Sequence, residues 1–185
     1  MNPPANPKSR KELIDQVHNS ATAADLHERI YWIYKNEDDR AKYIDTMNGY
    51  VGFFASSIQA HFIAIVVILY AIYEGRRDTV NMGRLYEGAS ADLKACVETD
   101  YNRAKSIWKK IAILRNNHFG HVSDRLDADA VFKRADITYD EIKELIELSK
   151  KLVNSFSYAE DRSSFVESLD SAKDTYRMLE RLRSS

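Results

Sequence analysis

The sequence contains very few residues that break a helix. Its three prolines, Pro3, Pro4 and Pro7, all lie within the first seven residues, and only 6 glycines occur among 185 residues. Because proline and glycine are the residues that most often end helices and form turns, their scarcity indicates an all-α protein. No alternating apolar pattern of useful length predicts a β-strand. We therefore expect a single all-α domain, a bundle of about five to six helices.

Cysteine is almost absent, and charge of either sign is not in excess. The lone Cys96 excludes an intramolecular disulfide and fits a reducing compartment. One cysteine and scattered histidines leave no closed zinc ligand set. The formal net charge of −1 gives the whole chain no attraction to nucleic acid or membrane. The N-terminus is polar and has no apolar segment typical of a signal peptide. We expect a cytoplasmic protein with no cofactor and no metal.

The longest hydrophobic run covers residues 62–73. Its twelve apolar residues are too few to span a bilayer. A helix that is apolar on all sides over three turns is typical of a central core helix or of an oligomer interface. We therefore expect no membrane contact. His61, directly before this run, is interpreted as a hydrogen-bonded histidine of the core or its edge.

Capping signals and helical periodicity predict the order of the helices. Ser9 is expected to cap a short helix to about residue 17, and the spacing of Thr22 and Asp25 predicts a second helix start. The spacing of Thr138 and Glu141 is that of a capping box. Residues 122–137 are expected to be irregular. The remaining helices are predicted over residues 40–73, 82–86, 90–120 and 164–182.

Positive charge is concentrated in one part of the chain. Between residues 103 and 134 there are eight Lys or Arg and three Asp or Glu, a local balance of +5. Lys109, Lys110 and Arg125 are therefore candidate RNA contacts, because lysine and arginine bind backbone phosphates. The alternative is a solvated helix face without a ligand.

The most informative stretch is Arg-Asn-Asn-His-Phe-Gly-His, residues 115–121, at the predicted end of the helix over 90–120. It places a permanent cation, two carboxamides and two imidazoles within seven residues. Such groups suit the binding of a phosphate and the transfer of a proton at neutral pH. Arg115 and His118 are three residues apart and share a helix face. The alternative is a polar helix end, where such residues commonly bind the last carbonyls.

This stretch resembles the motif of the HEPN superfamily, which has an Arg, four to six further residues and a His. Arg115, Asn116 and His121 fall on that motif, with five residues between Arg and His. The neighbouring residues 113–114 and 122–123 also fit. The order of the helices is similar to the AbiU-type branch, named for abortive infection by phage. The resemblance is strongest over residues 25–155, within a HEPN-like domain over residues 9–185 that follows a disordered tail over residues 1–8.

The resemblance implies a homodimer in which two motifs form a composite site. It also implies a metal-independent endoribonuclease, in which Arg115 stabilises charge on the phosphate, His121 transfers a proton and Asn116 orients them. His118, an additional histidine, and Glu74, at the end of the apolar helix, are candidate accessory residues. Ser123 stands where the branch paired with a nucleotidyltransferase has tyrosine, which argues against that subtype. The alternative is a non-catalytic module that binds RNA, a nucleotide or a protein partner such as an antitoxin or regulator.

Overall fold

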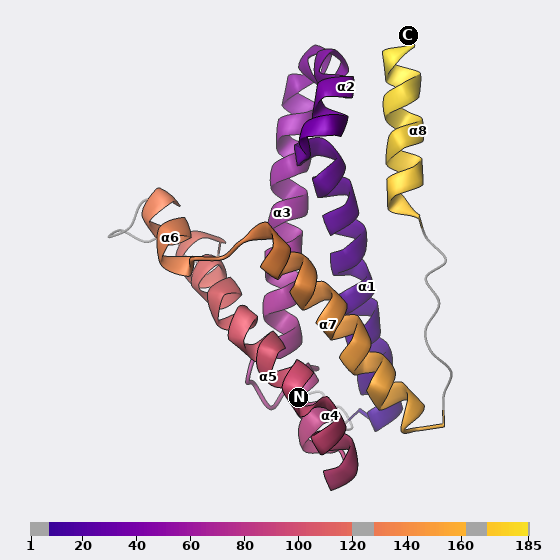
Figure 1. Cartoon of the computed structure of the whole chain (residues 1–185), viewed down its shortest axis with the longest axis vertical. Helices are drawn as coiled ribbons and strands as arrows, with labels where there is room; N and C mark the ends of the chain where they lie inside the picture. Colours follow the sequence, from indigo (N-terminus) through magenta and orange to yellow (C-terminus); the bar gives the residue numbers. More distant parts are fainter. Residues whose placement is uncertain (1–7, 120–127, 162–169, 185) are drawn as a thin grey trace, which may run out of the picture.

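A computed structural model describes residues 8–119, 128–161 and 170–184 (Figure 1). Every regular element in these ranges is a helix, which confirms the all-α prediction. The described ranges contain eight α-helices and one π-helical turn: α1 (Arg10–Lys35), α2 (Glu37–Gly49), α3 (Val51–Tyr73), α4 (Met82–Glu87), α5 (Ala91–Leu114), η1 (Arg115–Phe119), α6 (Ala128–Ala135), α7 (Tyr139–Tyr158) and α8 (Ser171–Arg183).

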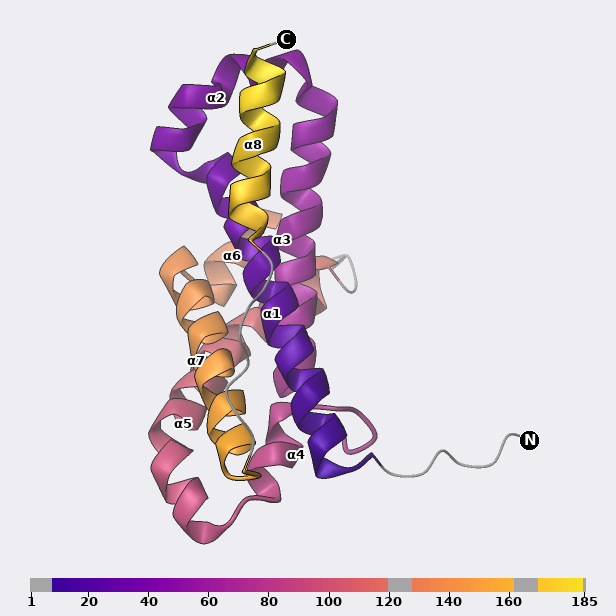
Figure 2. The same cartoon turned by 90° about the vertical axis from the view of Figure 1, so that its right-hand side faces the viewer.

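Helices α1 and α3 follow the long axis of the molecule. They lie side by side and run in opposite directions (Figures 1 and 2). Around one half of this pair pack α4, α5, α6 and α7. The other half is covered by α2 and α8, and α8 lies along α1 and α2. The molecule is therefore elongated, with different helices completing each half of the central pair.

Two separate hydrophobic clusters correspond to these two halves. The main core fills the half with α4–α7 and contains buried residues from those helices and from α1 and α3, including Ile14, Leu69, Ile111 and Leu145. The second cluster lies in the other half and consists of Ile33, Tyr34, Tyr43, Met47, Phe54 and Leu179. The side chains of each cluster are almost completely buried.

Helix α1 is one continuous helix, whereas the sequence suggested two helices over the same residues. Ser9 begins α1 as the predicted cap and forms a capping box, because its hydroxyl accepts from the backbone N–H of Glu12 while the Glu12 carboxylate accepts from the N–H of Ser9. The predicted second start at Thr22 is wrong. Ala21 and Ala24 are buried in the main core, so packing continues across the proposed break, and no glycine or proline interrupts it.

The helix predicted over residues 40–73 is divided in the structure. Asn36 separates α1 from α2 and caps α2 by accepting from the N–H of Asp39. The chain then breaks at Tyr50, which adopts φ −130° and ψ 43°, outside the helical region. Gly49 and Gly52 flank this break, and glycine disfavours the interior of a helix. The predicted end at Glu74 is confirmed.

The second half of the chain agrees with the capping signals and differs in the linkers. Thr138 and Glu141 form the predicted capping box at the start of α7. The stretch over 122–137 was expected to be irregular, but it contains α6, whose Val131 and Ala135 are buried in the main core. Asp170 caps α8, so the described part of the last predicted helix begins at Ser171. Residues 1–7 of the predicted tail lie outside the described ranges.

The apolar helix α3 is buried on one side only. Ile65, Val66 and Leu69 are fully buried, whereas Val67 is 44% exposed and Ala71 is also exposed. Burial in the core therefore explains the apolar residues on only one side of α3. The sequence run of twelve apolar residues is too short to span a bilayer, but in the described part of the chain α3 is one helix of 23 residues that is long and apolar enough to do so by length and composition.

Candidate functional site

The residues of the motif lie where the regular hydrogen bonding of α5 ends. Ser90 caps the first turn of α5 by accepting from the N–H of Leu93. The buried side chains of α5 form a stripe that ends at Leu114, and this stripe packs against α3 and α7. The next five residues, Arg115–Phe119, form a single π-helical turn. Such turns add one residue to a helix and are frequent at functional sites. The sequence motif therefore begins at a real discontinuity of the helix.

Arg115 is held from two sides. Its guanidinium carbon lies 4.7 Å from the centroid of the Tyr70 ring on α3. Its Nη1 donates a hydrogen bond of 3.1 Å to Oδ1 of Asn116, which is exposed. Arg115 itself remains partly exposed. A guanidinium stacked on an aromatic ring keeps its edge available for a phosphate. The structure thus joins Arg115 and Asn116 by a side-chain hydrogen bond.

The other residues of the motif are only partly described. Asn117 donates from Nδ2 to the carbonyl oxygen of Ile113 at 2.9 Å, so it caps the end of α5. His118 lies in the π-helical turn, but its side chain is outside the described part of the structure. His121 and Arg125 lie wholly outside the described residues. The role of His121 therefore rests on the sequence motif, and that of Arg125 on the local positive charge of the sequence.

A row of cations and aromatic rings extends from Arg115 along α5, with two stacked rings between two cations. The rings of Tyr70 and Trp108 stack with centroids 5.9 Å apart, and the Lys105 Nζ lies 4.4 Å from the centroid of the Trp108 ring. The Trp108 indole N–H donates to the Tyr70 carbonyl oxygen at 3.1 Å. Lys105, Trp108 and Arg115 share one face of α5, because they are three and seven residues apart.

Sequence reasoning missed most of this row. Tyr70 lies within the apolar run, Lys105 entered only the charge count, and both Tyr70 and Trp108 pack against the main core while remaining partly exposed. The spacing of Lys105, Trp108 and Arg115 was a readable signal, since helical periodicity places them together. The contact with Tyr70 was not readable, because it depends on how α3 crosses α5.

A polar pocket of about 250 Å³ lies at the end of α3, next to this row. Lys105 and Tyr73 line it, and Lys105 donates to the Tyr73 carbonyl oxygen at 3.4 Å. Burial, with a smaller contribution from the Lys109 ammonium, lowers the pKa of Lys105. Glu74 also lines this pocket, on the Lys105 side of the row. In the described contacts, Glu74 is not joined to Arg115, so its accessory role is not supported by a direct interaction.

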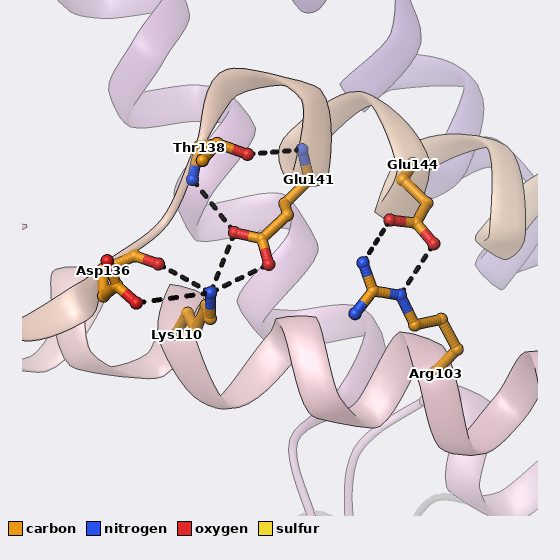
Figure 3. Close-up of polar contacts among 6 residues, drawn as sticks. All are labelled: Arg103, Lys110, Asp136, Thr138, Glu141 and Glu144. Atoms are coloured by element: carbon orange, nitrogen blue, oxygen red, sulfur yellow. Dashed lines mark hydrogen bonds and ion pairs between the residues drawn. The ribbon is translucent and has the colours of Figure 1, made fainter.

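Lys110 and Lys109, two candidate RNA contacts, lie in different surroundings. Lys110 donates to both carboxylate oxygens of Glu141, at 2.8 and 3.0 Å, and to the backbone carbonyl of Asp136 at 2.6 Å (Figure 3). Burial acts to raise the pKa of Glu141, but hydrogen bonds from Lys110 and from the Thr138 N–H lower this pKa below its usual value. Lys110 therefore ties α5 to the start of α7. Lys109 is exposed.

Histidine pairing occurs on the other face of α3. Nδ1 of His27 and Nδ1 of His61 are hydrogen-bonded at 2.8 Å, which confirms the interpretation of His61 as a hydrogen-bonded histidine. Burial lowers the pKa of both imidazoles, and His27 lowers that of His61 further. Among the described residues, no group of three or more His, Cys, Asp or Glu side chains is arranged to hold a metal ion.

The comparison with protein families agrees with the motif. A model of the AbiU2 family of HEPN domains matches residues 9–178, which is most of the chain. The chain belongs to this family. No curated protein and no solved structure matches it. Membership of the AbiU2 family confirms the resemblance carried by the motif and by the order of the helices. It also fits the all-α fold, in which the Arg of the motif ends a long helix.

Proposed function

We propose that this AbiU2 family member is a metal-independent endoribonuclease of the HEPN type. The observation that carries the proposal is the placement of Arg115. It stands partly exposed at the end of α5, stacked on Tyr70 and hydrogen-bonded to Asn116, where the family motif requires its arginine. A cation held in this way is preorganised for a phosphate, and preorganised charge is a large contribution to catalysis.

The proposed reaction is an attack of the RNA 2′-hydroxyl on the neighbouring phosphorus. A bond forms between O2′ and phosphorus, and the bond from phosphorus to O5′ breaks. The products are a 2′,3′-cyclic phosphate and a free 5′-hydroxyl. Arg115 stabilises the negative charge on the non-bridging oxygens, and His121 transfers the proton in the role that the family motif assigns to it. Asn116 keeps the guanidinium oriented through its amide oxygen.

The exposed side of α3 supports the dimer that a composite site requires. Val67 and Ala71 lie on this side of α3. Tyr70, whose ring stacks with the Arg115 guanidinium, belongs to the same helix. Further along the same helix, Ala60 and Phe53 are also exposed, and Phe53 is 58% exposed. An apolar helix face left open to water is typical of an oligomer interface. A second copy packed here in two-fold symmetry brings two Arg115 side chains toward one another.

The central experiment is RNA cleavage by purified protein in EDTA. Wild-type protein is expected to leave 2′,3′-cyclic phosphate ends, and both Arg115→Ala and His121→Ala are expected to reduce the rate by about 10²–10⁴-fold. His118→Ala tests which imidazole acts, because it should retain activity. Arg181→Ala, at an exposed arginine on α8, is the matched control and should cleave normally. Activity that survives all three motif substitutions, or that disappears in EDTA, contradicts the mechanism.

The dimer has its own test. Light scattering should give about twice the 21.3 kDa mass of one chain. Ala60→Glu places a charge on the exposed side of α3 and should yield a monomer with greatly reduced cleavage, because burial of an unpaired charge is costly. Ala41→Glu, at an exposed alanine of α2, is the control and should remain dimeric. A wild-type monomer that cleaves RNA would contradict a composite site.

The alternative is a module that binds RNA, a nucleotide or a protein partner without catalysis. The polar pocket beside Lys105 favours it, because phosphate binding requires cations but no proton transfer. Salt-sensitive RNA binding without cleavage would support this alternative. In either form, the family membership suggests a role in phage defence or toxin-like growth control within the cytoplasm. Expression of wild-type and Arg115→Ala protein in cells challenged with phage tests that role.

A further inference from the structure

The pocket at the end of α3 is lined mainly by cations. Its cationic side chains come from the connection after α3, from α4 and from α5: Arg76, Arg77, Arg84 and Lys105. Its acidic side chains, Glu74 and Glu87, are fewer. Four positive and two negative groups around a pocket of about 250 Å³ produce a site that attracts an anion. The chain as a whole carries no such excess of positive charge.

The floor of this pocket is a rigid structure. Asn81 is buried, and its side-chain oxygen accepts from the N–H of Arg84 while its Nδ2 donates to the carbonyl oxygen of Arg76 at 2.8 Å. Arg84 in turn donates from Nη1 to the carbonyl oxygen of Thr79 at 3.1 Å. These bonds fix the connection between α3 and α5. The guanidinium groups are therefore presented from a backbone that is held in one conformation.

The cations of the pocket differ in how they are engaged. Arg76 pairs with Asp78 at 2.7 Å, and both side chains are largely exposed to water. An exposed pair of this kind is weak and exchanges readily for another anion. Arg77 is exposed at the rim of the pocket. Lys105 lies deeper, between the Tyr73 carbonyl oxygen and the Trp108 ring.

The pocket and the candidate active site are linked through one shared side chain, Lys105. Lys105 belongs to both the pocket and the row of cations and rings, which leads through Trp108 and Tyr70 to Arg115. The three contacts that link Lys105 to Arg115 measure 4.4, 5.9 and 4.7 Å between side-chain groups. Lys105 and Arg115 are ten residues apart along α5 and the turn that follows it, a rise of about 15 Å, which corresponds to a few nucleotides of a single strand. Positive grooves beside aromatic side chains are typical of proteins that bind single strands.

We propose that this pocket binds a backbone phosphodiester of the RNA, a few nucleotides from the phosphate at Arg115. The proposal rests on the proposed function, because it assigns a second subsite to the same substrate. Arg77 and Arg76 contact the phosphate at the rim, and Lys105 connects this subsite to the cleavage site. The strand then follows the α3–α5 surface, and the Tyr70–Trp108 pair fixes the spacing between the two phosphate positions.

The test uses a substrate that cannot be cleaved. A short, fluorescently labelled single-stranded RNA with 2′-O-methyl groups lacks the attacking hydroxyl, so binding is measured without turnover. The double variant Arg76→Ala/Arg77→Ala should weaken binding by roughly tenfold at low salt. The slope of log K against log salt should fall in magnitude by about 0.7 for each phosphate that the variant no longer neutralises. Arg181→Ala is the control, and thermal melting verifies that each variant is folded.

The outcomes separate this inference from the proposed function. If the double variant binds with the affinity and salt slope of Arg181→Ala, the subsite is refuted, even if the wild-type protein cleaves RNA. If the wild type cleaves no RNA but its binding depends on Arg76 and Arg77, the subsite stands and the nuclease proposal fails. Binding of adenosine monophosphate that depends on these arginines, without binding of the strand, would refute the subsite in favour of a nucleotide pocket.

Discussion

The two halves of the molecule are built very differently around the same pair of helices. Among the described residues, the main core contains 25 buried residues contributed by six helices, whereas the second cluster contains six. Arg115, Tyr70, Trp108 and Lys105 all lie on the half with the main core. None of the described candidate site residues touches the second cluster. The half with the larger core therefore supports the site, and the other half is expected to loosen first.

The strongest test of this difference is a pair of identical substitutions. Leu69 and Leu179 are both fully buried, the first in the main core and the second in the smaller cluster. Leu69→Ala should reduce the free energy of unfolding by about 3–5 kcal/mol, because the dense surroundings cannot collapse into the cavity. Leu179→Ala should cost less, about 2–3 kcal/mol, because α8 can shift or detach. Urea denaturation measures both.

Hydrogen exchange sharpens the same comparison. In Leu179→Ala, the amides of α8 should lose protection while those of α5 and α7 keep it, because the halves have separate cores. RNA binding by this variant should remain near the wild-type value. If Leu179→Ala unfolds α5 together with α8, the two halves form one cooperative unit and the comparison is wrong.

Two ion pairs give the next largest effect. Lys110 bridges α5 and α7, and its partner Glu141 is only 16% exposed. Lys42 pairs with Glu180 in the other half at 2.6 Å, but both side chains are about half exposed. Lys110→Met should reduce stability by roughly 1–2 kcal/mol, because it leaves the Glu141 carboxylate without its partner. Lys42→Met should produce no resolvable change. Lys109→Met, at an exposed neighbour, is the control for loss of charge on α5.

Helix caps provide a smaller and more local test. Thr138→Ala removes the capping hydroxyl of α7 and should cost about 1 kcal/mol of global stability. Thr138→Ser keeps the hydroxyl and should behave like the wild type. Asp170→Ala removes the cap of α8, which accepts from the N–H of Lys173 at 3.0 Å. Its effect should appear in the exchange of α8 amides more than in global unfolding. The reverse pattern would mean that α8 is the more important of the two helices for global stability.

The smallest expected effect is a pH dependence of stability that arises from two histidines at the boundary between the halves. The pKa values of His27 and His61 are lowered in the folded chain, mainly by burial. The unfolded chain therefore binds more protons near pH 6.5, so stability is present above that pH and is lost as the pH falls below it. The melting temperature should fall by roughly a few degrees between pH 7.5 and 5.5. His61→Gln should flatten this dependence.

Local signals in the sequence predicted the helix caps, but not how many helices lie between them. Ser9, Ser90 and Thr138 were recognisable because a cap is a contact over three residues. The continuity of α1 through Thr22 was not, since burial of Ala21 and Ala24 against distant helices decided it. The helix α6 was missed for the same reason, because Val131 and Ala135 pack in the main core. Packing between distant segments overrides weak local preferences.

The candidate site shows the same division. Arg115 and Asn116 were predicted as a pair because they are adjacent in the motif. Lys110 looked like a phosphate ligand, and only the fold reveals that Glu141 and Asp136 surround it. Tyr70 and the pocket beyond Lys105 require three segments that are far apart in sequence. Sequence reasoning therefore identified the chemical groups, and tertiary structure supplied their neighbours.

The π-helical turn at Arg115–Phe119 also has a consequence for the evolution of this motif. The buried stripe of α5 ends at Leu114, so a residue inserted or deleted within the turn leaves the register of that stripe unchanged. Each such change rotates the outgoing chain by about 100° relative to α5. The turn thus separates the register of the motif from the register of the scaffold. A family whose Arg-to-His spacing varies can alter that spacing here without redesigning the bundle.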